Sequence, residues 1–161
     1  MKAIKFLMMI FAFMATLAVN AEEKTVNGQP YVLLNNGIWM PRFGIGTYNV
    51  PGDSTAQDAV SYALKCGYRH IDTAQAYGNE AGVGRGVRES GIPRAELFVV
   101  SKVAAENKSY SSAAESIDKT LETMGLDYLD MMIIHSPQPW AEFRGEKRYF
   151  EENREVWRAL E

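Results

Sequence analysis

The chain has 161 residues, of which 47% are hydrophobic and 23% are charged, and its formal net charge is −3. This composition is typical of one globular domain, and the lack of a basic run in the sequence argues against a nucleic-acid partner. The single cysteine, Cys66, excludes an internal disulfide framework. We expect Cys66 to be a small buried residue near the end of a helix.

The N-terminus has the pattern of an export signal. Two lysines precede an apolar run that ends at Val19, and this run is shorter than the roughly 20 residues of a membrane-spanning helix. Small residues follow, with a cleavage position after Ala21. We therefore expect a signal peptide at 1–21, a mature domain at 22–161, and a periplasmic or secreted protein without a stable membrane span. An uncleaved membrane anchor is the alternative.

A β-hairpin and four strand–helix pairs are expected to follow the leader. Asn35-Asn36-Gly37 separates two apolar runs, and Asn-Gly in that setting favours a tight hairpin turn. Asp53 or Ser54 is the expected N-cap of the first helix, and Ser111 or Ser112 that of the third. Apolar periodicity predicts four strands alternating with four helices: strands at 43–48, 68–73, 97–102 and 128–135, and helices at 55–65, 79–90, 112–124 and 150–161.

This alternation indicates a parallel sheet with right-handed crossovers, either an open doubly wound sheet or a (β/α)8 barrel. Asp72, Lys102 and His135 lie at C-terminal strand ends, where barrel enzymes carry their chemistry. An open sheet would usually have a glycine-rich phosphate loop after its first strand, and 44–49 lacks the third glycine of that loop. The glycine run at 82–86 falls inside a helix and is expected to serve helix packing.

Four groups with complementary chemistry follow three successive strands: Asp72, Tyr77, Lys102 and His135. A nearby ammonium stabilises a phenolate, and a carboxylate keeps the ammonium charged and in place. An imidazole can share the proton or orient a carbonyl oxygen. The four groups therefore suit protonation of a carbonyl oxygen as it becomes an alkoxide. No side chain supplies the accompanying hydride, so a nicotinamide cofactor is implied.

From about Tyr31 to its last residue, the chain resembles the aldo-keto reductase family. The resemblance is carried by the hairpin, the first strand of the sheet, the motif with the acid and the phenol, and the segment with the imidazole: 34–37, 40–41, 44–48, 67–80, 124–130 and 130–137. It implies a (β/α)8 TIM barrel closed at its base by the hairpin. It also implies reduction of aldehydes or ketones to alcohols with NADPH, with NADH as the alternative cofactor.

The same resemblance assigns catalytic roles. Tyr77 would be the proton donor, and Lys102 would assist its proton release. Asp72 would pair with Lys102. His135 would orient the substrate carbonyl. These four residues form the family's catalytic tetrad, and all four are present in this sequence.

The resemblance also assigns binding roles. Gly46, Thr47, Tyr48 and Asp72 would contact the nicotinamide end of the cofactor. Tyr48 and His135 would line the substrate pocket. The expected partner is a small-molecule carbonyl compound. No ligand spacing in the sequence predicts a metal site.

The chain is shorter than the about 250 residues that a barrel of this kind needs. We therefore expect the N-terminal half of the barrel, with about four βα units, an incomplete cofactor site and weak or no activity. A truncated reductase is the first interpretation. A half-barrel that pairs with itself or with a second chain through its open sheet edge is the second. A non-catalytic binding module is the third.

Overall fold

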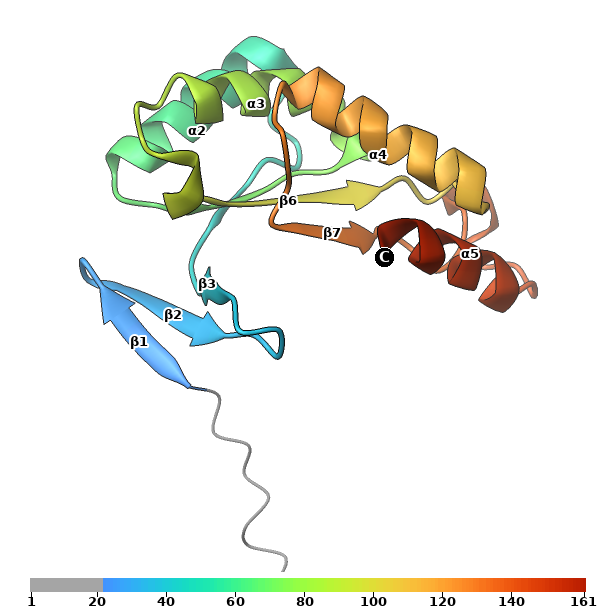
Figure 1. Cartoon of the computed structure of the whole chain (residues 1–161). Coiled ribbons are helices and arrows are strands. Elements are labelled where there is room, and N and C mark those ends of the chain that lie inside the picture. The colour runs from blue at the N-terminus through green and yellow to red at the C-terminus, as the bar shows by residue number, and fades with distance from the viewer. Residues whose placement is uncertain (1–21) are drawn as a thin grey trace, which may run out of the picture.

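The structure is a computed structural model, and it describes residues 22–161 (Figure 1). The predicted signal peptide at 1–21 lies outside the described residues, so it stays a prediction. Within the described range, none of the helices combines the length and the apolar character that crossing a bilayer requires.

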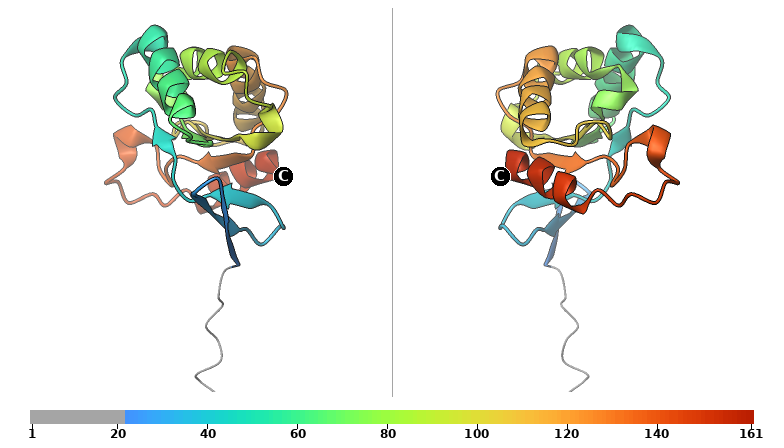
Figure 2. Two further views of the ribbon diagram at one scale, coloured as in Figure 1. Left: turned by 90° about the vertical axis from the view of Figure 1, so that its left-hand side faces the viewer. Right: turned by 90° about the vertical axis from the view of Figure 1, so that its right-hand side faces the viewer.

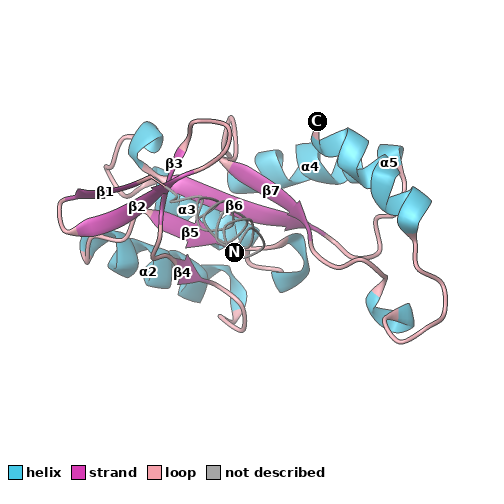
Figure 3. Cartoon of the chain, turned by 90° about the horizontal axis from the view of Figure 1, so that it is seen from below, coloured by secondary structure: helices cyan, strands magenta, loops and turns pink. Residues whose placement is uncertain are grey.

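Four parallel strands form the central sheet of residues 22–161, in the order β4-β5-β6-β7. Figure 3 shows these strands side by side from below. The parallel α/β class predicted from the sequence is confirmed. The strand bounds are β4 Ile45–Gly46, β5 His70–Asp72, β6 Phe98–Val103 and β7 Met131–Ile134.

A helix follows each of these strands, which gives four βα units in the described chain. Figures 1 and 2 show α2, α3 and α4 on one face of the sheet, while α5 lies beside α4 and β7. This arrangement is part of a (β/α)8 barrel, as expected. The bounds of the α-helices are α2 Gly52–Lys65, α3 Glu80–Arg88, α4 Tyr110–Met124 and α5 Phe150–Leu160, and those of the 3-10 turns are η1 Gln75–Tyr77, η2 Arg94–Glu96 and η3 Trp140–Glu142.

The main core lies between the sheet and the helices. Ile71 of β5 and Val99 of β6 are register partners, and both are fully buried in a cluster with side chains of α2 and α3. Because strand side chains alternate between faces, Asp72 and Lys102 fall on the other face of the sheet. The helix-covered core therefore takes one face of the strands, and Asp72 and Lys102 share the other face with the apolar Phe98 and Val100.

A three-stranded antiparallel sheet precedes the barrel strands and lies below them in Figure 1. Its strands are β1 Glu23–Val26, β2 Gln29–Leu33 and β3 Trp39–Pro41. The β2–β3 hairpin was predicted, whereas β1 was missed. Asn27 and Gly28 both have positive φ, at 50° and 79°, so the tight two-residue turn lies between β1 and β2. At the predicted turn only Gly37 has positive φ, and the loop is longer.

Two predicted helix caps were wrong. Ser109, and not Ser111 or Ser112, is the N-cap of α4, and its hydroxyl accepts from the Ser112 N–H. The N-cap of α2 is Pro51, which provides no side-chain hydrogen bond. The local Ser-rich sequence offered three capping oxygens, and only the backbone geometry distinguishes among them.

The expectation that Cys66 is buried was also wrong, although it does lie at a helix end. Cys66 is the C-cap of α2 and its thiol is exposed. The buried residues of α2 are Ala56, Val60, Ala63 and Leu64, and the helix ends at Lys65, so its buried stripe stops before position 66.

The glycines of α3 serve helix packing, as predicted. A Cβ at Gly82 would overlap the backbone of Asp53 in α2, and one at Gly84 would overlap the backbone of Met124 in α4. Because glycine has no side chain, the backbone of α3 can pack directly against the backbones of α2 and α4.

We predict that Gly84→Ala lowers the free energy of unfolding by about 1–3 kcal/mol, because the added methyl group must displace the end of α4. Urea denaturation measures this change. Gly46→Ala is the matched control, since a Cβ there meets nothing within 4 Å. Equal stability of the two variants would contradict the packing role of Gly84.

Candidate active site

The four predicted catalytic residues lie at the C-terminal edge of the sheet. Asp72 is the last residue of β5, Lys102 is the penultimate residue of β6, and His135 directly follows β7. Tyr77 ends η1, the short turn after β5. The order of strands and helices in the sequence predicted that these residues lie at this edge. The structure shows that their four side chains form one cluster.

Lys102 is the centre of this cluster. Its ammonium Nζ donates to Asp72 Oδ1 at 2.5 Å, to the Thr73 carbonyl oxygen at 2.8 Å and to the Tyr77 hydroxyl oxygen at 3.3 Å. These three acceptors use the three N–H donors of an ammonium. The Lys102 side chain is 11% exposed, so little water competes for those donors. Because the Tyr77 oxygen accepts from the ammonium, its own O–H proton remains available to another acceptor.

His135 lies on the other side of Tyr77. The centroids of the two rings are 5.5 Å apart, and the rings pack edge to face. Burial lowers the pKa of His135 below its usual value of 6.5, and the positive charge of Lys102 lowers it further. The carboxylates of Asp72 and Glu106 oppose this shift with a smaller effect. The imidazole is therefore neutral at neutral pH and can offer one N–H to a carbonyl oxygen.

Gly46 and Tyr48 flank the same cluster. Gly46 is the register partner of Asp72, and a Cβ placed there would meet nothing within 4 Å, so open space lies beside the carboxylate. The Tyr48 ring is 68% exposed and its centroid lies 5.2 Å from that of Tyr77. Both positions are therefore compatible with the predicted contacts to a cofactor and a substrate.

Thr47 has a different environment from its two neighbours. It is fully buried, and its hydroxyl lies within hydrogen-bonding distance of Thr73 Oγ1 at 2.9 Å and of Asn79 Oδ1 at 3.4 Å. The Asn79 amide donates in turn to the carbonyl oxygens of Thr47 and Val50. The structure therefore gives the Thr47 side chain a structural role, and its predicted cofactor contact stays a prediction.

A buried carboxylate lies behind the cluster. Glu80 Oε1 accepts from the Ser101 hydroxyl at 2.6 Å, and Oε2 accepts from the Thr120 hydroxyl at 3.3 Å. Burial raises the pKa of Glu80 above its ordinary value of 4.5, and the two hydrogen bonds lower it by less. This network connects the start of α3 to β6 and to α4.

Two contributors to the site were missed in the sequence. The Thr73 carbonyl oxygen accepts from Lys102, and a backbone oxygen has no signature in the sequence. The Trp140 ring lies edge to face with His135 at 5.3 Å and is 47% exposed. An aromatic residue five positions after His135 was the available signal, but the intervening prolines gave no periodicity that would place it.

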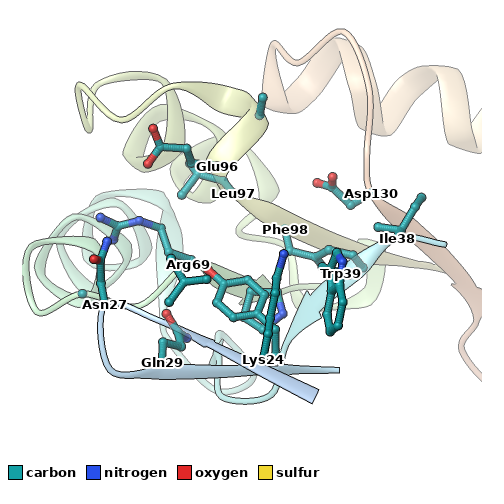
Figure 4. Close-up of a pocket in the computed structure, with 15 residues that line it drawn as sticks. Lys24, Asn27, Gln29, Ile38, Trp39, Arg69, Glu96, Leu97, Phe98 and Asp130 are labelled. Atoms are coloured by element: carbon teal, nitrogen blue, oxygen red, sulfur yellow. The ribbon is translucent and has the colours of Figure 1, made fainter. Parts of the chain in front are cut away.

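A cavity of about 580 Å³ lies away from these residues. It separates the β1–β3 sheet from the base of the central sheet, and Figure 4 shows Lys24, Trp39, Arg69 and Phe98 among its lining residues. None of the four tetrad residues lines it. Over residues 22–161, no group of three or more His, Cys, Asp or Glu side chains is arranged to hold a metal ion.

A comparison with protein families matches residues 40–161 to the model of the aldo/keto reductase family. Glyoxal reductase from Bacillus subtilis is 45% identical over 130 residues, which are 81% of this chain and 43% of that protein. The 9,11-endoperoxide prostaglandin H2 reductase of Trypanosoma cruzi is 38% identical over 130 residues, with 81% and 42% covered. The chain thus spans less than half the length of these curated relatives.

Solved structures of aldo-keto reductases are also similar to this chain. An aldo/keto reductase from Brucella melitensis superposes with a TM-score of 0.73 at 39% identity, covering 84% of this chain and 48% of that one. An aldo-keto reductase from Bombyx mori, in complex with NADP, superposes with a TM-score of 0.70 at 30% identity, covering 82% and 45%.

We predict that Lys102→Met raises the pKa of His135, because the substitution removes one of the two causes that lower it. NMR titration of the His135 ring protons measures the shift and requires no cofactor. The matched control is Lys119→Met, which removes an exposed lysine paired with Glu122 on α4. A His135 titration that is the same in both variants would exclude electrostatic coupling to Lys102.

We predict that the free energy of unfolding falls as the pH rises from 4.5 through the raised pKa of Glu80. Over that interval the folded state retains a proton that the unfolded state has lost. Glu80→Gln should remove this decline, whereas the exposed Glu146→Gln should keep it. Chemical denaturation at a series of pH values tests this, and an unchanged pH dependence in Glu80→Gln would reject it.

Proposed function

The chain belongs to the aldo/keto reductase family, and on this basis we propose that its site reduces an aldehyde or ketone to an alcohol with NADPH. The observation that carries the proposal is the Lys102 ammonium held between the Asp72 carboxylate and the Tyr77 hydroxyl. The family uses NADP(H), and the similar Bombyx mori enzyme contains NADP. The finer assignments below rest on the geometry of the tetrad.

Tyr77 supplies the proton in this proposal. A carbonyl oxygen placed beside Tyr77 and His135 becomes more negative as its carbon is reduced. The neutral His135 imidazole orients that oxygen with an N–H, and the Tyr77 O–H transfers its proton to it. The Lys102 ammonium stabilises the phenolate that remains, and Asp72 holds Lys102 in place.

The residues present fit the nicotinamide end of a cofactor. One oxygen of Asp72 accepts from Lys102, and the side chain is 38% exposed next to the open space at Gly46. A partly exposed carboxylate can accept from a ribose hydroxyl, and the exposed ring of Tyr48 offers an apolar surface at the same edge. When bound, NADPH would supply the hydride that no side chain can provide.

A second candidate is a binding or oligomer-forming module. It is favoured by the edge of β7, which within residues 22–161 pairs only with β6 and leaves Ile133 38% exposed. An apolar strand edge is a surface that another strand can extend. The tetrad geometry gives no reason for such a module to keep four catalytic groups in contact, so reduction is our first proposal.

We predict that Tyr77→Phe lowers the rate of NADPH oxidation with an aldehyde by roughly 10²- to 10⁴-fold, the usual contribution of a positioned proton donor. NADPH binding, followed by its fluorescence, should be unchanged. Glyoxal and an aromatic aldehyde are suitable probes, since one relative is a glyoxal reductase. Tyr62→Phe, on an exposed face of α2, is the matched control.

Wild-type rates should be measured at several protein concentrations, with the mass determined by light scattering. Turnover by wild type and Tyr62→Phe, but not by Tyr77→Phe, supports the proposal. Equal turnover in all three would reject Tyr77 as proton donor. A folded wild-type protein that shows no turnover and forms a stable dimer would favour the binding module.

A further inference from the structure

Tyr77 is carried by a turn that has little structure of its own. η1 is one 3-10 turn of three residues. Its backbone bonds run from the Tyr77 N–H to the Ala74 carbonyl at 3.0 Å and from the Gly78 N–H to the Gln75 carbonyl at 3.4 Å. Short 3-10 turns have poorer hydrogen-bond geometry than α-helices. Something outside the turn must therefore fix the Tyr77 hydroxyl.

The Gln75 side chain provides that connection. Its Oε1 accepts from the Ala104 N–H at 2.7 Å, directly after β6. Its Nε2 donates to the Ser116 carbonyl at 3.0 Å and to the Thr120 hydroxyl at 3.1 Å, both in α4. One amide therefore ties the turn both to the strand that carries the ammonium and to the neighbouring helix.

The bond to Ala104 has a specific geometric effect. Lys102 lies two residues before Ala104, and Tyr77 lies two residues after Gln75. Both hydrogen bonds, Gln75–Ala104 and Lys102–Tyr77, therefore connect the η1 turn to the C-terminal end of β6. The Lys102–Tyr77 distance of 3.3 Å is at the long end for a hydrogen bond, so a small displacement of the turn would break it.

We propose that Gln75 is a positioning residue, which holds the Tyr77 hydroxyl within hydrogen-bonding distance of Lys102 through its bond to the Ala104 N–H. Gln75 touches neither substrate nor cofactor in this role. Its effect on catalysis rests on the proposed reductase function, whereas its effect on the position of Tyr77 does not.

Three substitutions distinguish the hydrogen bond from Ala104 to Gln75 from the hydrogen bonds that Gln75 donates to α4. Gln75→Met keeps the length of the side chain and removes all three hydrogen bonds. Gln75→Glu keeps an oxygen that can accept from Ala104 and removes the donor to α4. Thr120→Val removes the α4 hydroxyl that Gln75 and Glu80 share and leaves the Ala104 bond intact. Thermal unfolding of each variant reports the purely structural cost.

The first readout requires neither cofactor nor turnover. In NMR spectra, Gln75→Met should shift the Tyr77 ring cross-peak and speed hydrogen exchange at the Ala104 amide. Gln75→Glu and Thr120→Val should preserve both signals. The inference is overturned if Gln75→Met leaves the Tyr77 and Ala104 signals unchanged.

The second readout is steady-state reduction of an aldehyde. Gln75→Met should lower kcat by roughly 10- to 100-fold with little change in KM, since the reacting groups are misplaced by a fraction of their spacing. Gln75→Glu should restore most of kcat. A loss in Thr120→Val as large as in Gln75→Met would assign the effect to general packing. If the wild-type chain gives no turnover, the proposed function fails, and the NMR result alone decides the position of Tyr77.

Discussion

The geometry of the site depends on one requirement. The nearly buried Lys102 ammonium needs an oxygen acceptor for each of its three N–H donors. Lys102 can satisfy its N–H donors only if the end of β5, the next backbone carbonyl and the turn carrying Tyr77 all converge on it. Burying a charged group without such partners is costly. The register of β5 against β6 meets this requirement because it brings the C-terminal ends of both strands to one edge. Strand pairing and local electrostatics thus specify the same arrangement.

The scaffold behind this ammonium is held by close packing of helices and by buried hydrogen bonds. Glycines let α3 approach α2 and α4, which fixes the layer behind the sheet. In the same layer, buried Asn79 and Glu80 connect the segment after β5 to the residue after β4, to β6 and to α4. A polar network that is satisfied in this way restricts the site to one geometry. The geometry of the site therefore depends on both kinds of contact.

The sequence predicted the four barrel strands, the four helices after them and the edge at which their polar residues meet, because strand–helix alternation and apolar periodicity can be read from the chain alone. It also contained the Asn27-Gly28 turn, which was overlooked in favour of the turn at Gly37. Other features could not be predicted. The burial of Thr47 depends on a partner 32 residues away, and the contact of Trp140 with His135 depends on how a proline-rich loop folds back. Such tertiary partners leave no periodic signal.

The β1–β3 sheet has a separate consequence. Its strands pair only with one another within the described chain, and a cavity of about 580 Å³ lies between them and the barrel strands. The His70 ring nitrogen Nδ1 lies 3.0 Å from the Pro41 carbonyl oxygen, and the Gln29 amide donates to the Phe43 carbonyl at 2.9 Å. Because a cavity takes up part of this interface, we expect this sheet to open more readily than the paired barrel strands. Such an opening would uncover the barrel floor at Phe98, at the end of the sheet opposite the Lys102 ammonium.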